Sequence, residues 1–454
     1  MKKNNANIEF VGICHDLSSE GKGVVSYNGV IGFVDDLLPG EKAKILITYL
    51  KKDIFYGKVV SLLESSNDRC KPRCPHFKEC GGCSVMHLNY PAQLKYKQNK
   101  VEQCLSRIGG LNVKINPTIG MDEPYCYRNK IQMPIKMSKK GKIISGFYKE
   151  KTHDIVPLDT CFIENPKADK ILTSIKSLMK KFKIQPYDED RRTGVIRHVL
   201  IRTSYHFDEI MVVLVTNVDA FPGRNDFIKN LKQQNPEITT IVQNINTRDT
   251  NVILGEKQRI LSGKGFIKDI LCGIEFKISP KSFYQVNPLQ TEKLYSLAIE
   301  SASISKEDLV LDAYCGIGTI GLIASKKCKN VVGVEIVKEA VIDACNNAKN
   351  NNITNAYFYE GDAGKFIVEQ YKQGIKFDVV IMDPPRKGSD EAFLSTLIKT
   401  KPNKVVYVSC DPATLARDLK YLSSTYDIVS VTPVDMFPHT SHVESVVCLS
   451  RKEQ

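Results

Sequence analysis

The sequence contains no long uncharged hydrophobic run. A membrane-spanning helix needs about 20 predominantly apolar residues in succession, and no stretch of this 454-residue chain approaches that length. The first residues, Met-Lys-Lys-Asn, lead into polar sequence without the apolar segment of a secretory signal. We therefore expect a cytoplasmic protein without a membrane partner.

Internal repeats and low-complexity segments are also absent, which excludes solenoid and disordered architectures. The chain is too long for one ordinary hydrophobic core, so two or three domains are expected. Its 14 cysteines would be unusual as disulfides in a cytoplasmic protein, which favours metal binding, catalysis or simple burial.

Acidic residues are outnumbered by basic ones. The chain has 64 Lys and Arg against 51 Asp and Glu, a net charge of +13, and residues 61–160 alone hold 17 basic against 9 acidic residues. A concentrated basic surface favours a polyanion such as RNA or DNA, because neutralising phosphates releases counterions. A merely soluble, lysine-rich surface has the same composition, so charge alone leaves both interpretations open.

The pattern of apolar residues divides the chain into three parts and predicts an α/β multidomain protein. Short apolar runs alternate with glycine turns over residues 1–63, which predicts a small β-barrel. Residues 64–274 combine a cysteine-rich hinge, a polar helix over about 90–108 and a mixed α+β pattern. Strand and helix patterns alternate over residues 275–454, which predicts a doubly wound parallel sheet.

The first strand of this last part runs into a glycine-rich turn at 312–321. Gly316, Gly318 and Gly321 let the backbone approach a ligand closely, and Glu335 ends the next strand, where a carboxylate can bind ribose hydroxyls. The spacing also fits a dinucleotide site. Asp312, however, puts a negative charge where a pyrophosphate would approach. Together with Gly-Asp-Ala at 361–363, the pattern resembles the S-adenosylmethionine site of class I methyltransferases.

Two later strand ends carry Asp383, in an Asp-Pro-Pro-Arg motif, and Cys410, which follows the apolar run 404–409. Open α/β sheets place reactive groups at such ends, although an isolated cysteine is often only buried. A thiolate can add to C6 of a pyrimidine and so make C5 nucleophilic, after which a base must remove the C5 proton. Glu444, just before the final strand 445–449, is the favoured base, with His439 and His442 as alternatives.

Five motifs jointly resemble the RNA uracil-C5 methyltransferases, which form 5-methyluridine, and the resemblance covers nearly the whole chain. They are Tyr-Arg-Asn-Lys at 127–130, Ser-Phe-Tyr-Gln-Val-Asn at 282–287, Asp-Pro-Pro-Arg-Lys-Gly at 383–388, Val-Ser-Cys-Asp-Pro at 408–412 and His-Val-Glu at 442–444.

The resemblance implies a role for each of six residues and for each part of the chain. Cys410 would be the nucleophile and Glu444 the base, and the S-adenosylmethionine contacts would be Gln285, Tyr314, Glu335 and Asp383. It further implies a TRAM/OB-like RNA-binding barrel over 1–63, a central α+β domain with an iron-sulfur cluster over 64–274, and a class I methyltransferase domain over 275–454. We expect the helix near 92–112 to pack on the catalytic domain.

The cysteine-rich hinge has the spacing C-x5-C-x2-C at Cys74, Cys80 and Cys83, which can wrap thiolates around one site. The spacing leaves the fourth ligand open. Cys70 is local and would complete an all-cysteine zinc site, whereas Cys161 is remote and matches the pattern of the family. By resemblance we expect a [4Fe-4S] cluster on Cys74, Cys80, Cys83 and Cys161.

A barrel together with a cluster resembles the ribosomal branch of the family, whereas the tRNA branch commonly lacks both, so the expected substrate is 23S rRNA. No DNA partner is expected. The expected enzyme is a monomer, because RNA can supply most of the binding surface. Two alternatives remain: a tRNA uridine-C5 methyltransferase, and a non-catalytic iron-sulfur protein that binds RNA or assists ribosome assembly.

Overall fold

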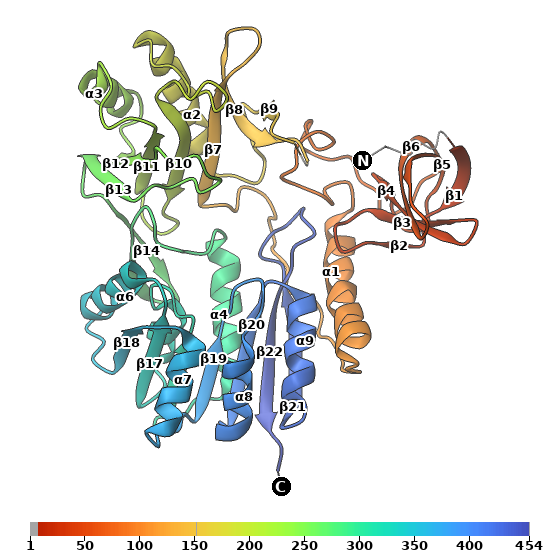
Figure 1. Cartoon of the computed structure of the whole chain (residues 1–454), viewed down its shortest axis with the longest axis vertical. Helices are drawn as coiled ribbons and strands as arrows, with labels where there is room; N and C mark the ends of the chain where they lie inside the picture. Colours follow the sequence, from red (N-terminus) through yellow and green to blue (C-terminus); the bar gives the residue numbers. More distant parts are fainter. Residues whose placement is uncertain (1–7, 151, 454) are drawn as a thin grey trace.

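The computed structural model describes residues 8–150 and 152–453, and its chain forms three β-sheet bodies. In Figure 1 the amino-terminal sheet lies to the right, the central sheet above and the carboxy-terminal sheet below. No helix in the described part of the chain is long and apolar enough to span a bilayer. All 14 cysteines are free thiols.

The amino-terminal body is a six-stranded sheet in the order β1-β5-β6-β4-β3-β2 that curls around its own core. Alternate residues of its strands point inward, as in Lys42–Leu50, where Ala43, Ile45 and Ile47 are buried. Its strands are β1 (Ile8–Ile13), β2 (Asp16–Leu17), β3 (Gly23–Tyr27), β4 (Val30–Asp35), β5 (Lys42–Leu50) and β6 (Ile54–Glu64).

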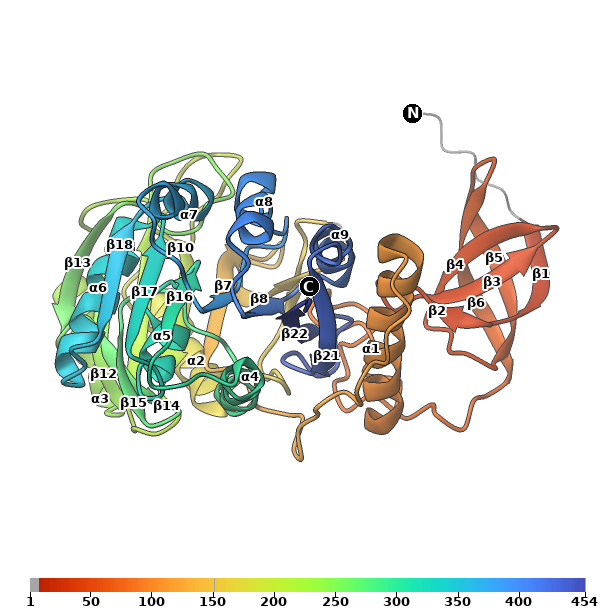
Figure 2. The same ribbon diagram turned by 90° about the horizontal axis from the view of Figure 1, so that it is seen from below.

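A cysteine-rich segment without regular elements leads to helix α1 (Tyr90–Cys104), which continues as the π-helical turn η1 (Leu105–Gly109). The Asn89 side chain caps α1 by accepting from the backbone N–H of Ala92. Residues 93, 97 and 101 share a buried face, and α1 contacts α9 and β21 of the carboxy-terminal body. Figure 2 shows α1 between the amino-terminal sheet and that body.

The central body is a seven-stranded sheet in the order β13-β12-β11-β10-β7-β8-β9. Strands β10 and β11 are buried on both faces, because alternate residues face different cores. Val212 packs with α2 and α3, whereas Met211 and Val213 pack with the carboxy-terminal body. The elements are β7 (Lys130–Met137), β8 (Ile143–Tyr148), β9 (Ile155–Pro157), α2 (Pro166–Lys181), β10 (Ile196–Thr203), β11 (Ile210–Thr216), α3 (Arg224–Gln234), β12 (Ile238–Ile245) and β13 (Lys257–Ser262).

A hairpin of β14 (Ile267–Leu271) and β15 (Ile274–Ile278) joins the central and carboxy-terminal bodies. It lies across the domain boundary expected between 274 and 275. Both strands bury their apolar residues in the core cluster that also holds α4 and β16, so the hairpin packs with the carboxy-terminal body.

The carboxy-terminal sheet has the order β18-β17-β16-β19-β20-β22-β21. The five strands from β18 to β20 are parallel, and β22 runs antiparallel to both neighbours. The elements are α4 (Pro288–Ala302), β16 (Leu309–Ala313), α5 (Thr319–Ala324), β17 (Asn330–Glu335), α6 (Lys338–Asn350), β18 (Ala356–Glu360), α7 (Ala363–Lys372), β19 (Val379–Met382), α8 (Glu391–Thr400), β20 (Lys404–Ser409), α9 (Pro412–Leu422), β21 (Tyr426–Val434) and β22 (Glu444–Arg451).

Helices cover both faces of this sheet. Residues of α4, α5 and α6 form one core with it, and residues of α7, α8, α9 and α1 form the other. The predicted parallel alternation is confirmed for β16 to β20. The sequence patterns did not reveal β21, the edge strand whose partner β22 carries Glu444 at its start.

Candidate active site

One cavity of about 790 Å³ opens at the carboxyl ends of the parallel strands. Parallel α/β sheets bind ligands at this edge, because the loops that follow adjacent strands meet there. All six residues singled out for catalysis or cofactor binding line it: Gln285, Tyr314, Glu335, Asp383, Cys410 and Glu444.

The glycine turn after β16 forms one wall of this cavity. Gly316 and Gly318 have positive φ angles of 55° and 81°, which glycine adopts without strain, and an added Cβ on Gly318 would lie 2.8 Å from Phe358. The buried Asp312 carboxylate accepts from the Gly321 N–H through Oδ2, at 2.7 Å, while its Oδ1 has no partner. Burial raises the pKa of Asp312 to about 8. The turn therefore places the backbone of Gly316 and the unpaired Oδ1 of Asp312 where they are close to any ligand in the cavity.

Glu335 and Tyr314 are held in place by neighbours in the same wall. The Glu335 carboxylate accepts from the backbone N–H groups of Gly316 and Val337, at 3.1 and 2.9 Å. Tyr314 also has a positive φ, 65°, and its hydroxyl lies 2.9 Å from Ser389 Oγ. The acid at the end of β17 is thus oriented by the glycine turn, as a ribose-binding carboxylate needs to be.

Asp383 and Gln285 enter the cavity from separate elements. Desolvation raises the pKa of Asp383, which follows β19, to about 7. Gln285 precedes α4, and the buried Tyr295 of α4 lines the same cavity. Sequence reasoning missed Tyr295, since nothing in the α4 sequence marks it as more than a core residue.

Cys410 and Glu444 lie at the ends of two paired strands. Cys410 follows β20, and its thiol pKa is raised to about 11 by desolvation and by the nearby Glu444 and Asp383 carboxyls. Glu444 begins β22 and is 4% exposed, and burial together with Asp383 raises its pKa to about 8. Arg386 opposes both shifts. Cys410, the candidate nucleophile, and Glu444, the candidate base, therefore line the same partly desolvated cavity, close to the positive charge of Arg386.

Several further residues line the cavity. Arg386 lines the cavity, but the sequence analysis did not name it as a site residue. Its position three residues after Asp383, in the Asp-Pro-Pro-Arg motif, could have indicated that it lies in the site. Arg128 and Lys130, from the Tyr-Arg-Asn-Lys motif, also line it, and burial beside Arg202 and Arg128 lowers the pKa of Lys130 to about 8.

The two histidines considered as alternative bases differ in position. His442 lines the cavity. His439 does not; its ring stacks on Tyr125, with the centroids 4.5 Å apart, and its Nδ1 lies 3.2 Å from Gln93 Nε2. Burial lowers the pKa of His439 to about 4. His439 is therefore a packed structural residue.

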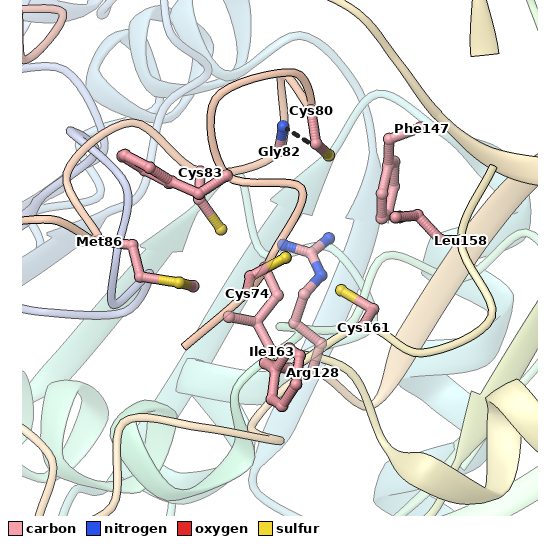
Figure 3. Close-up of a pocket in the computed structure, with 12 residues that line it drawn as sticks. Cys74, Cys80, Gly82, Cys83, Met86, Arg128, Phe147, Leu158, Cys161 and Ile163 are labelled. Carbon is pink, nitrogen blue, oxygen red and sulfur yellow. Dashed lines mark hydrogen bonds between the residues drawn. The ribbon is translucent and has the colours of Figure 1, made fainter. Parts of the chain in front are cut away.

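A second cavity, of about 220 Å³, adjoins the first through Gly82 and Arg128, which line both. Figure 3 shows its thiols, and their residues come from two separate segments: Cys74, Cys80, Cys83 and Cys161. The other candidate ligand, Cys70, is not among the lining residues, and its Sγ lies 3.4 Å from the carbonyl of Met86.

The second cavity is mainly apolar and is lined by four thiols from two segments of the chain. Cysteine thiolates are ligands of both zinc ions and iron-sulfur clusters, so the lining residues are of a type that fits either group. The described residues contain no group of three or more His, Cys, Asp or Glu side chains already gathered around one metal position.

Comparison with known proteins agrees with this geometry. Residues 89–452 match the model of the tRNA (uracil-5-)-methyltransferase family. The chain belongs to this family of RNA uracil-C5 methyltransferases. It is therefore an S-adenosylmethionine-dependent RNA methyltransferase, and its carboxy-terminal body is a class I methyltransferase domain.

Individual members of the family are similar over almost their full length. An uncharacterized RNA methyltransferase of Halalkalibacterium halodurans is 46% identical over 96% of each chain, and one of Listeria innocua is 46% identical over 99% of each. A solved structure, the Pyrococcus abyssi tRNA (uracil-54, C5)-methyltransferase in complex with S-adenosyl-L-homocysteine, has a TM-score of 0.77 and 30% identity, and covers 97% of this chain and 99% of its own.

Proposed function

We propose that this protein methylates C5 of a uridine in 23S rRNA, with Cys410 as the covalent nucleophile and Glu444 as the base. One observation carries the proposal: a single cavity holds the thiol, the buried carboxyl and the four candidate cofactor contacts. An exocyclic amine would need no thiol, whereas C5 of uracil becomes nucleophilic only after addition at C6.

The cofactor, when bound, supplies an electrophilic methyl group on sulfonium sulfur. Glu335, oriented by Gly316, would bind the ribose hydroxyls. Gln285, Tyr314 and Asp383 would complete the cofactor site from the remaining walls.

Cys410 and Glu444 would act in successive steps of the reaction. Cys410 Sγ, as thiolate, forms a bond to C6 of the uracil, and the resulting enolate forms the C5–methyl bond at the expense of the sulfonium–methyl bond. The Glu444 carboxylate then takes the C5 proton. The Sγ–C6 bond breaks, which restores the C5=C6 double bond of the uracil and releases the Cys410 thiolate. The raised pKa of Glu444 makes it a stronger base than an exposed carboxylate.

We further propose a [4Fe-4S] cluster on Cys74, Cys80, Cys83 and Cys161, whose thiols line one cavity. Such a cluster would tie residues 74–83 covalently to the segment around Cys161. The sheet of residues 8–64 would be a TRAM-like RNA-binding barrel. We also propose that the protein is a monomer located in the cytoplasm, where thiols stay reduced.

A tRNA uridine is the second candidate substrate. The Pyrococcus abyssi protein acts on uracil-54 of tRNA and resembles this chain over nearly its full length, so a long amino-terminal region does not by itself separate the two substrates. Mapping 5-methyluridine in rRNA and tRNA from a strain lacking the gene would separate them: we expect loss from 23S rRNA and an unchanged tRNA level, and the reverse would establish the tRNA candidate.

The catalytic assignment is tested with RNA that contains 5-fluorouridine. Fluorine at C5 cannot be removed as a proton, so the methylated adduct stays bonded to the nucleophile. We expect a covalent protein–RNA complex that survives denaturation with the wild-type protein and none with Cys410→Ala. An undiminished complex with that variant would exclude Cys410 as the nucleophile, and a wild-type protein that forms no complex while methylating ordinary RNA would contradict the covalent mechanism.

A further inference from the structure

Residues 435–443 connect β21 to β22 and deliver Glu444 to the active site. Phe437, Thr440 and His442 from this connection line the large cavity. His439 has a φ of 68°, a left-handed conformation that is uncommon for residues other than glycine. The surroundings of His439 are therefore part of what determines where Glu444 lies.

The cysteine-rich segment bonds directly to this connection. The backbone N–H groups of Ser84 and Val85, immediately after Cys83, both donate to the His439 carbonyl at 3.0 Å. The Ser84 hydroxyl accepts from the Ser441 N–H at 2.8 Å. Three hydrogen bonds thus join two residues of the cysteine-rich segment to the residues that lead into β22.

Helix α1 holds the same residue from another side. Gln93, which is 1% exposed, accepts from the His439 N–H through Oε1 at 2.9 Å. Its Nε2 donates to the Leu88 carbonyl at 2.7 Å and lies 3.2 Å from His439 Nδ1. The Gln93 side chain therefore contacts both the backbone N–H and the ring Nδ1 of His439.

Stacked rings connect His439 to both cysteine segments. Tyr125 stacks on the His439 ring, and the Arg73 guanidinium lies over Tyr125 at 4.8 Å and over Phe162 at 5.4 Å. Arg73 and Phe162 are the sequence neighbours of Cys74 and Cys161. The contacts to His439 described above thus come from Gln93 on α1, from Ser84 and Val85, and from Tyr125.

We propose that Ser84 and Gln93 are positioning residues for Glu444, acting through the backbone of 439–441. The inference rests on the proposed role of Glu444 as base. A base must come within hydrogen-bonding distance of the proton it removes, and a displacement of about 1 Å can slow such a step about 100-fold. Loosening the connection should therefore slow proton removal more than the earlier steps.

The test compares Gln93→Leu and Ser84→Ala with a matched control, Gln98→Leu. Gln98 is on the same helix, and its side chain donates to the Ile115 carbonyl rather than to 435–443. In single turnover with unmodified RNA, we expect both test variants to transfer the methyl group within about threefold of the wild-type rate and to release product about 10- to 100-fold more slowly. A protein–RNA adduct that survives denaturation should accumulate. Ser84→Thr, which keeps the hydroxyl, should restore release.

The outcomes separate this inference from the proposed function. Glu444→Gln serves as the reference for a disabled base. If that variant accumulates adduct and the Gln93 and Ser84 variants turn over normally, or lose methyl transfer without adduct, the positioning role is wrong. If Glu444→Gln itself turns over normally, the proposed base is wrong. Thermal unfolding of each variant identifies a loss caused only by instability, and Ser84→Ala, a small change at a partly exposed side chain, keeps the test decisive if Gln93→Leu does not fold.

Discussion

Cys410 and Glu444 face each other across two antiparallel strands. Ser409 at the end of β20 pairs with Ser445 of β22, so the next residue along one strand, Cys410, lies beside the preceding residue of the other, Glu444. The reversed direction of β22 creates this relationship, because it brings the start of one strand to the end of its neighbour. The nearby Glu444 carboxyl consequently helps to raise the pKa of the Cys410 thiol.

Glu444→Gln should stop the reaction after methyl transfer. Glutamine preserves the shape of the side chain but cannot take the C5 proton, so we expect turnover to fall at least about 100-fold while covalent adduct accumulates with ordinary RNA. Denaturing electrophoresis of the protein with labelled RNA measures the adduct. Normal turnover in this variant would contradict the assignment.

The rate should increase with pH through the neutral range. The pKa of Glu444 is raised to about 8 and that of the Cys410 thiol to about 11, and the proposed mechanism needs both groups deprotonated. We expect kcat/KM to rise from about pH 6 to about pH 9. If the rate stayed constant over that range while enzyme and RNA remained stable, deprotonation of Cys410 or Glu444 would not limit the rate, which would contradict the prediction.

Glu444 should also reduce the stability of the folded protein at neutral and alkaline pH. Its pKa is about 8 when folded, against an ordinary value of 4.5, so folding favours the protonated form. Stability attributable to this group is fully present below about pH 4.5 and is lost as pH rises toward about 8. We expect Glu444→Gln to unfold at a higher temperature than wild type at pH 8 and at a similar temperature near pH 4; calorimetry measures both.

Anaerobically purified protein should be brown and absorb near about 400 nm, as thiolate-bound iron-sulfur centres do. Cys161→Ser should reduce this absorption and the iron content, because Cys161 lines the cavity with Cys74, Cys80 and Cys83. Cys70→Ser is the matched control and should keep both, since Cys70 is not a lining residue. A colourless wild-type protein with one zinc per chain would overturn the cluster.

Removing one partner of the buried Lys97–Asp435 ion pair should destabilise the protein strongly. Both side chains are fully buried, and Tyr90 also donates to Asp435, at 3.0 Å. Lys97→Met leaves a buried carboxylate without its cation, which costs about 3–5 kcal/mol of unfolding free energy. Adding Asp435→Asn should recover part of that loss in urea unfolding. Equal instability of the single and double variants would contradict this account.

Most local features could be predicted from the sequence. The strands that became β16 to β20 were recognisable because they are short apolar runs that end in glycine or acidic turns. The helix expected over 90–108 is present as α1 and η1, because its buried side chains recur at helical spacing. Strand β21 was less visible, because only two of its nine residues are exposed and its last four are all buried, so apolar and polar positions do not alternate regularly along it.

The sequence by itself determined which groups stand at the strand ends: Gly316, Glu335, Asp383 and Cys410 occupy local motifs whose conformation depends on near neighbours. Only the tertiary structure decided which distant residues meet them. It brought Glu444 beside Cys410, set Cys161 rather than Cys70 around the cavity of the other cysteines, and joined Ser84 and Gln93 to His439. Local periodicity encodes helices and strands, whereas contacts between segments tens or hundreds of residues apart depend on how all three sheets bury their apolar faces together.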